Sequence, residues 1–113
     1  MNETAKILCV DDEPAVLDAL RRTLYRSRPN WLVFQADSAA SALQQLHEQA
    51  FDVVITDVQM PHASGLELLR QIKRSPSLSE TGVVVVTGMQ DDALKSQALE
   101  LGASDLLAKP YIA

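Results

Sequence analysis

The sequence predicts an α/β protein built around a parallel five-stranded sheet, and two observations carry that prediction. Short β-branched runs recur along the chain, and each of the first four is followed by a stretch in which apolar residues have helical spacing. The runs are apolar without alternation, which is typical of strands that are covered on both faces. Alternation of strand and helix then predicts a sheet flanked by helices and joined by right-handed crossovers.

Five runs are the candidate strands. Three of them are continuously apolar and two are weaker, and in chain order they cover residues 7–10, 31–34, 53–55, 83–86 and 106–108. Five strands suit a flavodoxin-like (βα)5 fold with the strand order 2-1-3-4-5. In that order the first, third, fourth and fifth strands are consecutive neighbours, and this arrangement decides which residues can meet.

The linking segments begin and end with helix signals. Pro14 suits a first helical turn, Ser38 is a preferred cap residue, and Ser64 with Glu67 has the spacing of a capping box. Gly102 follows the fourth segment as a helix stop. Apolar residues recur at near-helical spacing within the four segments: Leu17, Leu20 and Leu24; Ala39, Leu43, Leu46 and Ala50; Leu68, Leu69 and Ile72; Leu94, Ala98 and Leu101.

The length of 113 residues predicts one domain. The chain stops three residues after Pro110, so the final helix of a (βα)5 fold is expected to be missing or truncated. We therefore interpret residues 1–113 as one domain of a longer protein, or as a domain whose uncovered sheet face is met by a neighbour. A homodimer formed through that face is a further hypothesis.

Composition excludes several classes of function. The net charge of −5 argues against direct nucleic-acid binding and against an anionic membrane surface as a partner. Cys9 is the single cysteine, so an intramolecular disulfide is impossible, and no Cys/His zinc spacing is present. No signal segment or membrane-length apolar run is found. These features favour a cytoplasmic setting, with Cys9 as a core residue.

Polar residues gather at the carboxyl ends of four of the five predicted strands. They are Asp11 and Asp12 after the first strand, Asp57 at the third, Thr87 at the fourth and Lys109 at the fifth. Adjacent strands lie about 4.8 Å apart, so the predicted strand order would bring all of these residues to one edge of the sheet. Ligands bind at this edge in open parallel sheets.

The residue types at this edge predict phosphoryl chemistry. Three crowded carboxylates repel one another unless a cation neutralises them. An all-oxygen ligand set without His or Cys favours Mg²⁺ or Mn²⁺ over zinc. A lysine adds positive charge and a threonine hydroxyl adds a hydrogen bond. Together these groups are the parts needed for phosphoryl transfer to a carboxylate.

Four segments of the chain resemble the motifs of response regulator receiver domains. They are residues 9–14 (CVDDEP), residues 56–61 (TDVQMP), residues 86–88 (VTG), and the stretch from Gly102 to the Lys109-Pro110 pair. Each motif alone is weak, but all four in this order and spacing are highly specific. The resemblance implies that residues 1–113 are a chemotaxis-regulator-like receiver domain of a two-component signalling system, part of a response regulator with a C-terminal output domain.

The resemblance also implies a metal site. Asp57 would accept a phosphoryl group from a phosphohistidine of a sensor histidine kinase or a phosphotransfer protein. Asp12 would ligate Mg²⁺ directly, and Asp11 would act mainly through a bound water. The backbone carbonyl of Gln59 would complete the ligands that the protein supplies, with Mn²⁺ as an alternative ion.

Thr87 and Lys109 would contact the phosphoryl oxygens, again by resemblance. Such a domain is a phosphorelay switch rather than an enzyme in the ordinary sense, because it catalyses only its own phosphorylation and dephosphorylation. One residue departs from the family pattern. Leu106 stands three residues before Lys109, where the family usually has Tyr or Phe, and this departure questions the usual coupling between the threonine and that aromatic side chain.

Two alternatives to a phosphorylated switch remain open. A phosphatase of the haloacid dehalogenase type also forms an aspartyl phosphate, but it needs an aspartate two residues after the nucleophile, where this chain has Gln59. A pseudo-receiver would be an interaction module that never takes a phosphoryl group. Leu106 and the absent last helix keep the pseudo-receiver hypothesis open.

Overall fold

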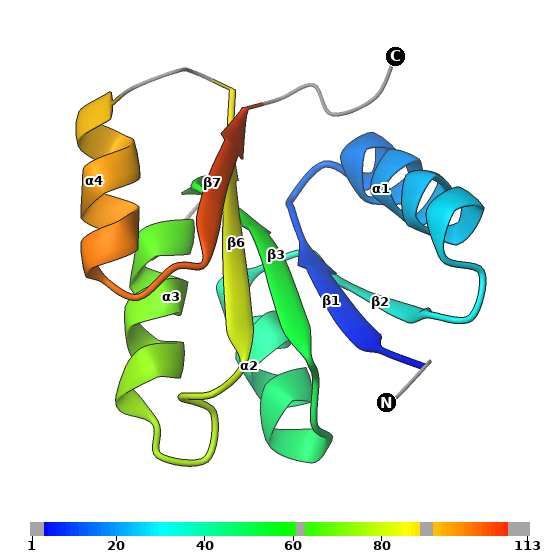
Figure 1. Cartoon of the computed structure of the whole chain (residues 1–113), viewed down its shortest axis with the longest axis horizontal. Coiled ribbons are helices and arrows are strands. Elements are labelled where there is room, and N and C mark those ends of the chain that lie inside the picture. Colours follow the sequence, from blue (N-terminus) through cyan, green and yellow to red (C-terminus); the bar gives the residue numbers. More distant parts are fainter. Residues whose placement is uncertain (1–3, 61–62, 89–91, 109–113) are drawn as a thin grey trace.

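A five-stranded parallel sheet forms the centre of the computed structural model, which describes residues 4–60, 63–88 and 92–108 (Figure 1). Its strands are β1 (Lys6–Val10), β2 (Leu32–Ala36), β3 (Val53–Asp57), β6 (Gly82–Thr87) and β7 (Asp105–Ala108). They lie in the order β2-β1-β3-β6-β7, which is 2-1-3-4-5 when the five strands are counted along the chain. The predicted fold class is therefore confirmed, and the predicted strands shift at their ends by only one or two residues.

Four helices connect these strands: α1 (Pro14–Ser27), α2 (Ala39–Glu48), α3 (Gly65–Arg74) and α4 (Asp92–Glu100). The predicted start signals of α1 and α2 are confirmed. Pro14 stands in the first turn of α1, and the Ser38 side chain accepts a hydrogen bond from the backbone N–H of Ser41. Gly102 follows α4 with φ +106°, a left-handed conformation that favours glycine at a helix end.

The capping box of α3 forms only in part. The Ser64 hydroxyl accepts a hydrogen bond from the backbone N–H of Glu67 at 3.2 Å, as predicted. The Glu67 carboxylate accepts a hydrogen bond from the Arg70 guanidinium at 2.6 Å, one turn further along the helix. Glu67 therefore pairs with Arg70 within the helix, although the capping-box pattern predicts that its carboxylate points towards the helix start.

The sheet separates two groups of apolar side chains. On one face, α2, α3 and α4 pack against residues of β1, β3 and β6, and α1 packs on the opposite face (Figure 1). The buried members of the first group are Leu8, Val10, Ala36, Ala42, Leu46, Phe51, Val54, Val58, Leu68, Leu69, Ile72, Leu78, Val83, Val85, Ala98 and Ala103. The second group has Ile7, Cys9, Leu17 and Leu20 as its buried members, with Trp31 packed against them. Layers on both faces explain why the strands are apolar without alternation.

A two-stranded antiparallel ladder follows β3 and was not predicted from the sequence. Its strands are β4 (Gln59–Met60) and β5 (Ala63–Ser64), with Gln59 opposite Ser64. The ladder turns the chain back towards the start of α3. In the part of the chain that the structure describes, no helix has both the length and the apolar character needed to cross a membrane.

Candidate functional site

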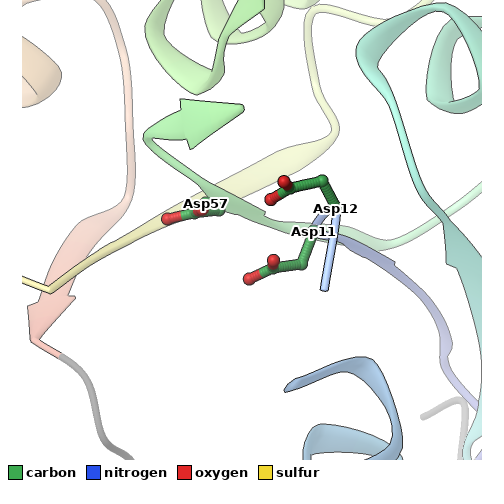
Figure 2. Close-up of side chains that lie close together, drawn as sticks. All are labelled: Asp11, Asp12 and Asp57. Carbon is green, nitrogen blue, oxygen red and sulfur yellow. The ribbon is translucent and has the colours of Figure 1, made fainter. Parts of the chain in front are cut away.

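Three carboxylates meet at the carboxyl edge of the sheet, as predicted. Asp11, Asp12 and Asp57 each offer one carboxylate oxygen, and these atoms all lie within 4.8 Å of one another. Figure 2 shows Asp11 and Asp12 at the end of β1, close to Asp57 at the end of β3. Asp11 and Asp57 are buried, with 2% and 6% of their surfaces exposed, whereas Asp12 is exposed.

Strand register explains this convergence. β1 and β3 are parallel neighbours in which Val10 pairs with Thr56. Asp11 and Asp57 therefore each lie one residue beyond the same rung of the ladder, although 46 positions separate them in the chain. Parallel strands end at the same edge of a sheet, so their first polar residues become neighbours.

The turn after β1 fixes Asp11. Its backbone N–H donates to the carbonyl of Ala36 at 3.1 Å, which extends the contact between β1 and β2. Its side-chain Oδ1 accepts a hydrogen bond from the backbone N–H of Glu13 at 2.9 Å. Such a side-chain-to-backbone bond, two residues on, is the Asx-turn that aspartate favours. This turn leads directly into α1 at Pro14.

The other predicted site residues fall into two groups. Thr87 ends β6, one residue beyond Val86, which pairs with Asp57, and it is 2% exposed. The backbone of Gln59 lies in β4, two residues beyond Asp57. Lys109 lies outside the described residues, so its predicted place at this edge stays a prediction.

Cys9 lies on β1 but belongs to the core rather than to the site. It is fully buried in the cluster that α1 covers. Burial raises the pKa of its thiol from 9.0 to about 12, because the charged thiolate loses its hydration there. A thiol that stays protonated is a poor nucleophile and metal ligand, which confirms the prediction of a core residue.

Two residues beside the acid cluster were not predicted from the sequence as parts of the site. The buried Thr56 hydroxyl donates to the carbonyl oxygen of Asp57 at 3.1 Å. Gly65, the first residue of α3, lies against the same carbonyl group. The glycine at a helix start was a usable signal, because glycine often marks a close approach of two backbone segments. Nothing in the sequence pattern distinguished Thr56 from an ordinary strand residue.

The fold and this edge define the chain as a doubly wound α/β domain with a carboxylate site at the carboxyl ends of its strands. Comparison with known protein families then gives its family. Residues 7–113 match the response regulator receiver domain, and the chain belongs to that family.

Individual relatives agree with this assignment. The chain is 33% identical over 110 residues to the transcriptional regulatory protein ResD of Bacillus subtilis (strain 168), covering 97% of this chain and 43% of ResD. The chain therefore spans less than half the length of this relative. Among solved structures, the chemotaxis response regulator CheY4 of Vibrio cholerae has a TM-score of 0.87 at 28% identity, with 96% of this chain and 88% of CheY4 covered. The BeF3-activated DrrB receiver domain has a TM-score of 0.83 at 32% identity, with 96% and 87% covered.

Proposed function

We propose that this domain is a phosphorylation-controlled switch in which Asp57 accepts a phosphoryl group from a phosphohistidine. The donor would be a sensor histidine kinase or a phosphotransfer protein. The observation that carries the proposal is the meeting of Asp11, Asp12 and Asp57 within 4.8 Å at the ligand-binding edge of a receiver-domain sheet. Structural packing alone gives no reason to hold two buried carboxylates and a third one so close together.

The donor set fits a magnesium ion. Asp11, Asp12 and Asp57 supply only carboxylate oxygens, which suit Mg²⁺ or Mn²⁺ better than zinc. These three side chains and the backbone carbonyl of Gln59 would hold the ion. When bound, the ion would offset the negative charge of the carboxylates and of the phosphoryl oxygens.

The chain's own residues would carry the transfer as follows. A carboxylate oxygen of Asp57 attacks the phosphorus in line, forming an acyl phosphate as the phosphorus–nitrogen bond of the phosphohistidine breaks. The imidazole leaves with the electron pair of that bond and takes a proton from water. The Thr87 hydroxyl donates to a phosphoryl oxygen and Lys109 pairs with another. Water later hydrolyses the acyl phosphate, which resets the switch.

The output of the switch is proposed from its relatives. ResD is named a transcriptional regulatory protein, and this chain covers 43% of it. We infer that the domain acts within a response regulator whose C-terminal output domain responds to phosphorylation. Added phosphate charge at the sheet edge would shift a pre-existing balance between two conformations. The homodimer suggested by the sequence stays a prediction.

Intact mass after incubation with Mg²⁺ and acetyl phosphate tests the proposal. We expect one added phosphoryl group, which is lost when Mg²⁺ is removed and in the Asp57→Asn variant. The Asp37→Asn variant is the matched control, because Asp37 is an exposed acid that follows β2.

The same mass measurement separates a phosphorylated switch from a pseudo-receiver that takes no phosphoryl group. Leu106 occupies the position of the family's switch aromatic and packs against the core cluster that α2, α3 and α4 cover. A leucine in place of this aromatic residue is the observation that favours a phosphorylation-independent interaction module. No phosphoryl adduct and no beryllofluoride binding would favour that module over the switch.

A further inference from the structure

The peptide group between Asp57 and Val58 is held on several sides by residues with no assigned role in the proposed reaction. Its carbonyl oxygen accepts a hydrogen bond from the Thr56 hydroxyl at 3.1 Å, and Thr56 is fully buried. Its N–H, which belongs to Val58, donates to the carbonyl oxygen of Val86 at 2.9 Å. Both polar groups of this one peptide therefore have buried partners.

Helix α3 closes the remaining side of this peptide. A Cβ atom at Gly65 would overlap the carbonyl oxygen of Asp57 and would lie 2.9 Å from its carbonyl carbon and 3.1 Å from the Cα of Val58. The backbone N–H of Gly65 also donates to the carbonyl oxygen of Val58 at 2.8 Å. Any side chain at residue 65 would have to push the helix and the peptide apart.

This peptide connects two parts of the candidate site. The Asp57 carboxylate extends from the Cα on its amino side, and Gln59, whose carbonyl is a proposed ligand, follows one residue after Val58. A displacement of this peptide that carries the Cα of Asp57 would move the carboxylate and the Gln59 carbonyl together. A buried hydroxyl and a helix start that fix this peptide would therefore fix the acceptor relative to Asp11 and Asp12 as well.

We propose that Thr56 and Gly65 are positioning residues that hold the Asp57–Val58 peptide and thereby aim the Asp57 carboxylate. The proposal rests on the proposed function, since it assigns these residues a part in the phosphorylation of Asp57. Neither residue touches the phosphoryl group, and each acts through the peptide. Loss of the Thr56 hydroxyl would leave a buried carbonyl without that donor and free the peptide to tilt.

The alternative is a purely structural role, in which Thr56 only fills space in the core. Valine has nearly the same shape as threonine, so Thr56→Val removes the hydroxyl and keeps the volume. Thr56→Ser does the reverse, because it keeps the hydroxyl and removes a buried methyl group. The two variants therefore separate hydrogen bonding from packing, whichever way stability changes.

The test measures the rate of phosphorylation by acetyl phosphate as a function of its concentration, together with urea unfolding. For Thr56→Val we expect about a tenfold lower maximal rate, since small misplacement of a reacting group costs up to about a hundredfold. For Thr56→Ser we expect a near wild-type rate in spite of lower stability. Gly65→Ala should also lower the maximal rate, by displacing the same peptide.

Thr81→Val is the matched control, because Thr81 is a buried threonine at the opposite end of the sheet, just before β6. Its rate should stay at the wild-type value. Equal rates for wild type and Thr56→Val, or a Thr56→Ser rate as low as that of Thr56→Val, would overturn the positioning role. A wild-type chain that takes no phosphoryl group would instead overturn the proposed function, and the positioning role with it.

Discussion

At the scale of single residues, the environment of each carboxylate differs although all three lie together. Asp11 and Asp57 are buried, and Asp11 is fixed by a turn, whereas Asp12 is exposed on the solvent side of the cluster. Like charges held this close raise the free energy of the folded state until a cation binds. We therefore expect the cation-free domain to be less stable than the domain with Mg²⁺ bound.

Asp12→Asn should raise the free energy of unfolding without divalent ions, because it removes one of the repelling charges. The same variant should bind Mg²⁺ at least 10-fold more weakly, because the loss of a residue that only supports a ligand already costs about 10- to 100-fold. Urea unfolding with and without excess Mg²⁺ measures both effects. Asp37→Asn is the control and should show the wild-type Mg²⁺ response. This prediction fails if Asp12→Asn is less stable than wild type without Mg²⁺ and gains as much stability from Mg²⁺ as wild type does.

Cys9 should make the stability of the domain fall at alkaline pH. Its pKa is raised from 9.0 to about 12, so between these values the unfolded chain loses the proton that the native chain keeps. The stability that this thiol contributes is fully present below pH 9 and is lost as the pH rises towards 12. Cys9→Ala should remove this part of the alkaline decline, in addition to a constant cost for the cavity. If the free energies of unfolding of wild type and variant changed in parallel with pH through this range, burial would not keep the native thiol protonated.

At the scale of elements, the ends of helices and strands hold the site edge in place. The carboxyl ends of β1 and β3 carry the acids, and the start of α3 packs on the peptide that follows Asp57. At the opposite end of α3, the Lys73 amino group donates to the carbonyl oxygens of Ser79 and Thr81, at 3.0 and 2.8 Å. These bonds attach α3 to the segment that enters β6.

Lys73→Met should destabilise the domain by about 2 kcal/mol, because two hydrogen bonds from a charged donor are lost while the apolar stem stays. The stem lies against Gly102, where an added Cβ atom would lie 3.1 Å from the Cγ of Lys73. Chemical unfolding measures the loss, and Lys95→Met on the exposed side of α4 should change stability by less than about 0.5 kcal/mol. Equal effects of the two substitutions would show that the bonds of Lys73 add little.

At the scale of the whole molecule, the strand order was predictable because local patterns and one topological rule determine it. Apolar runs gave the strands, Ser38 and Gly102 gave helix ends, and the order 2-1-3-4-5 then brought Asp11 and Asp57 together. These inferences need only sequence-local signals and the usual handedness of crossovers.

Other features leave no clear signal in the sequence pattern and were not predictable in the same way. The β4–β5 ladder has too few residues for a periodic signal. The hydroxyl of Thr56 bonds to the carbonyl of the next residue, which nothing in a strand pattern indicates. The approach of Gly65 to this carbonyl arises only once α3 packs on the sheet. The partial capping box at Ser64 arose because Arg70 offers Glu67 a charged partner.

Reductive trapping of the phosphorylated protein shows directly whether Asp57 is the residue that accepts the phosphoryl group. Borohydride reduces an acyl phosphate to an alcohol and converts the phosphorylated aspartate to homoserine, which peptide mass mapping then locates. After treatment with Mg²⁺ and acetyl phosphate, we expect homoserine at residue 57 and unchanged aspartates at residues 11 and 12. Homoserine at residue 11 or 12, or unmodified Asp57 in a protein that carries phosphate, would contradict the proposal that Asp57 is the acceptor.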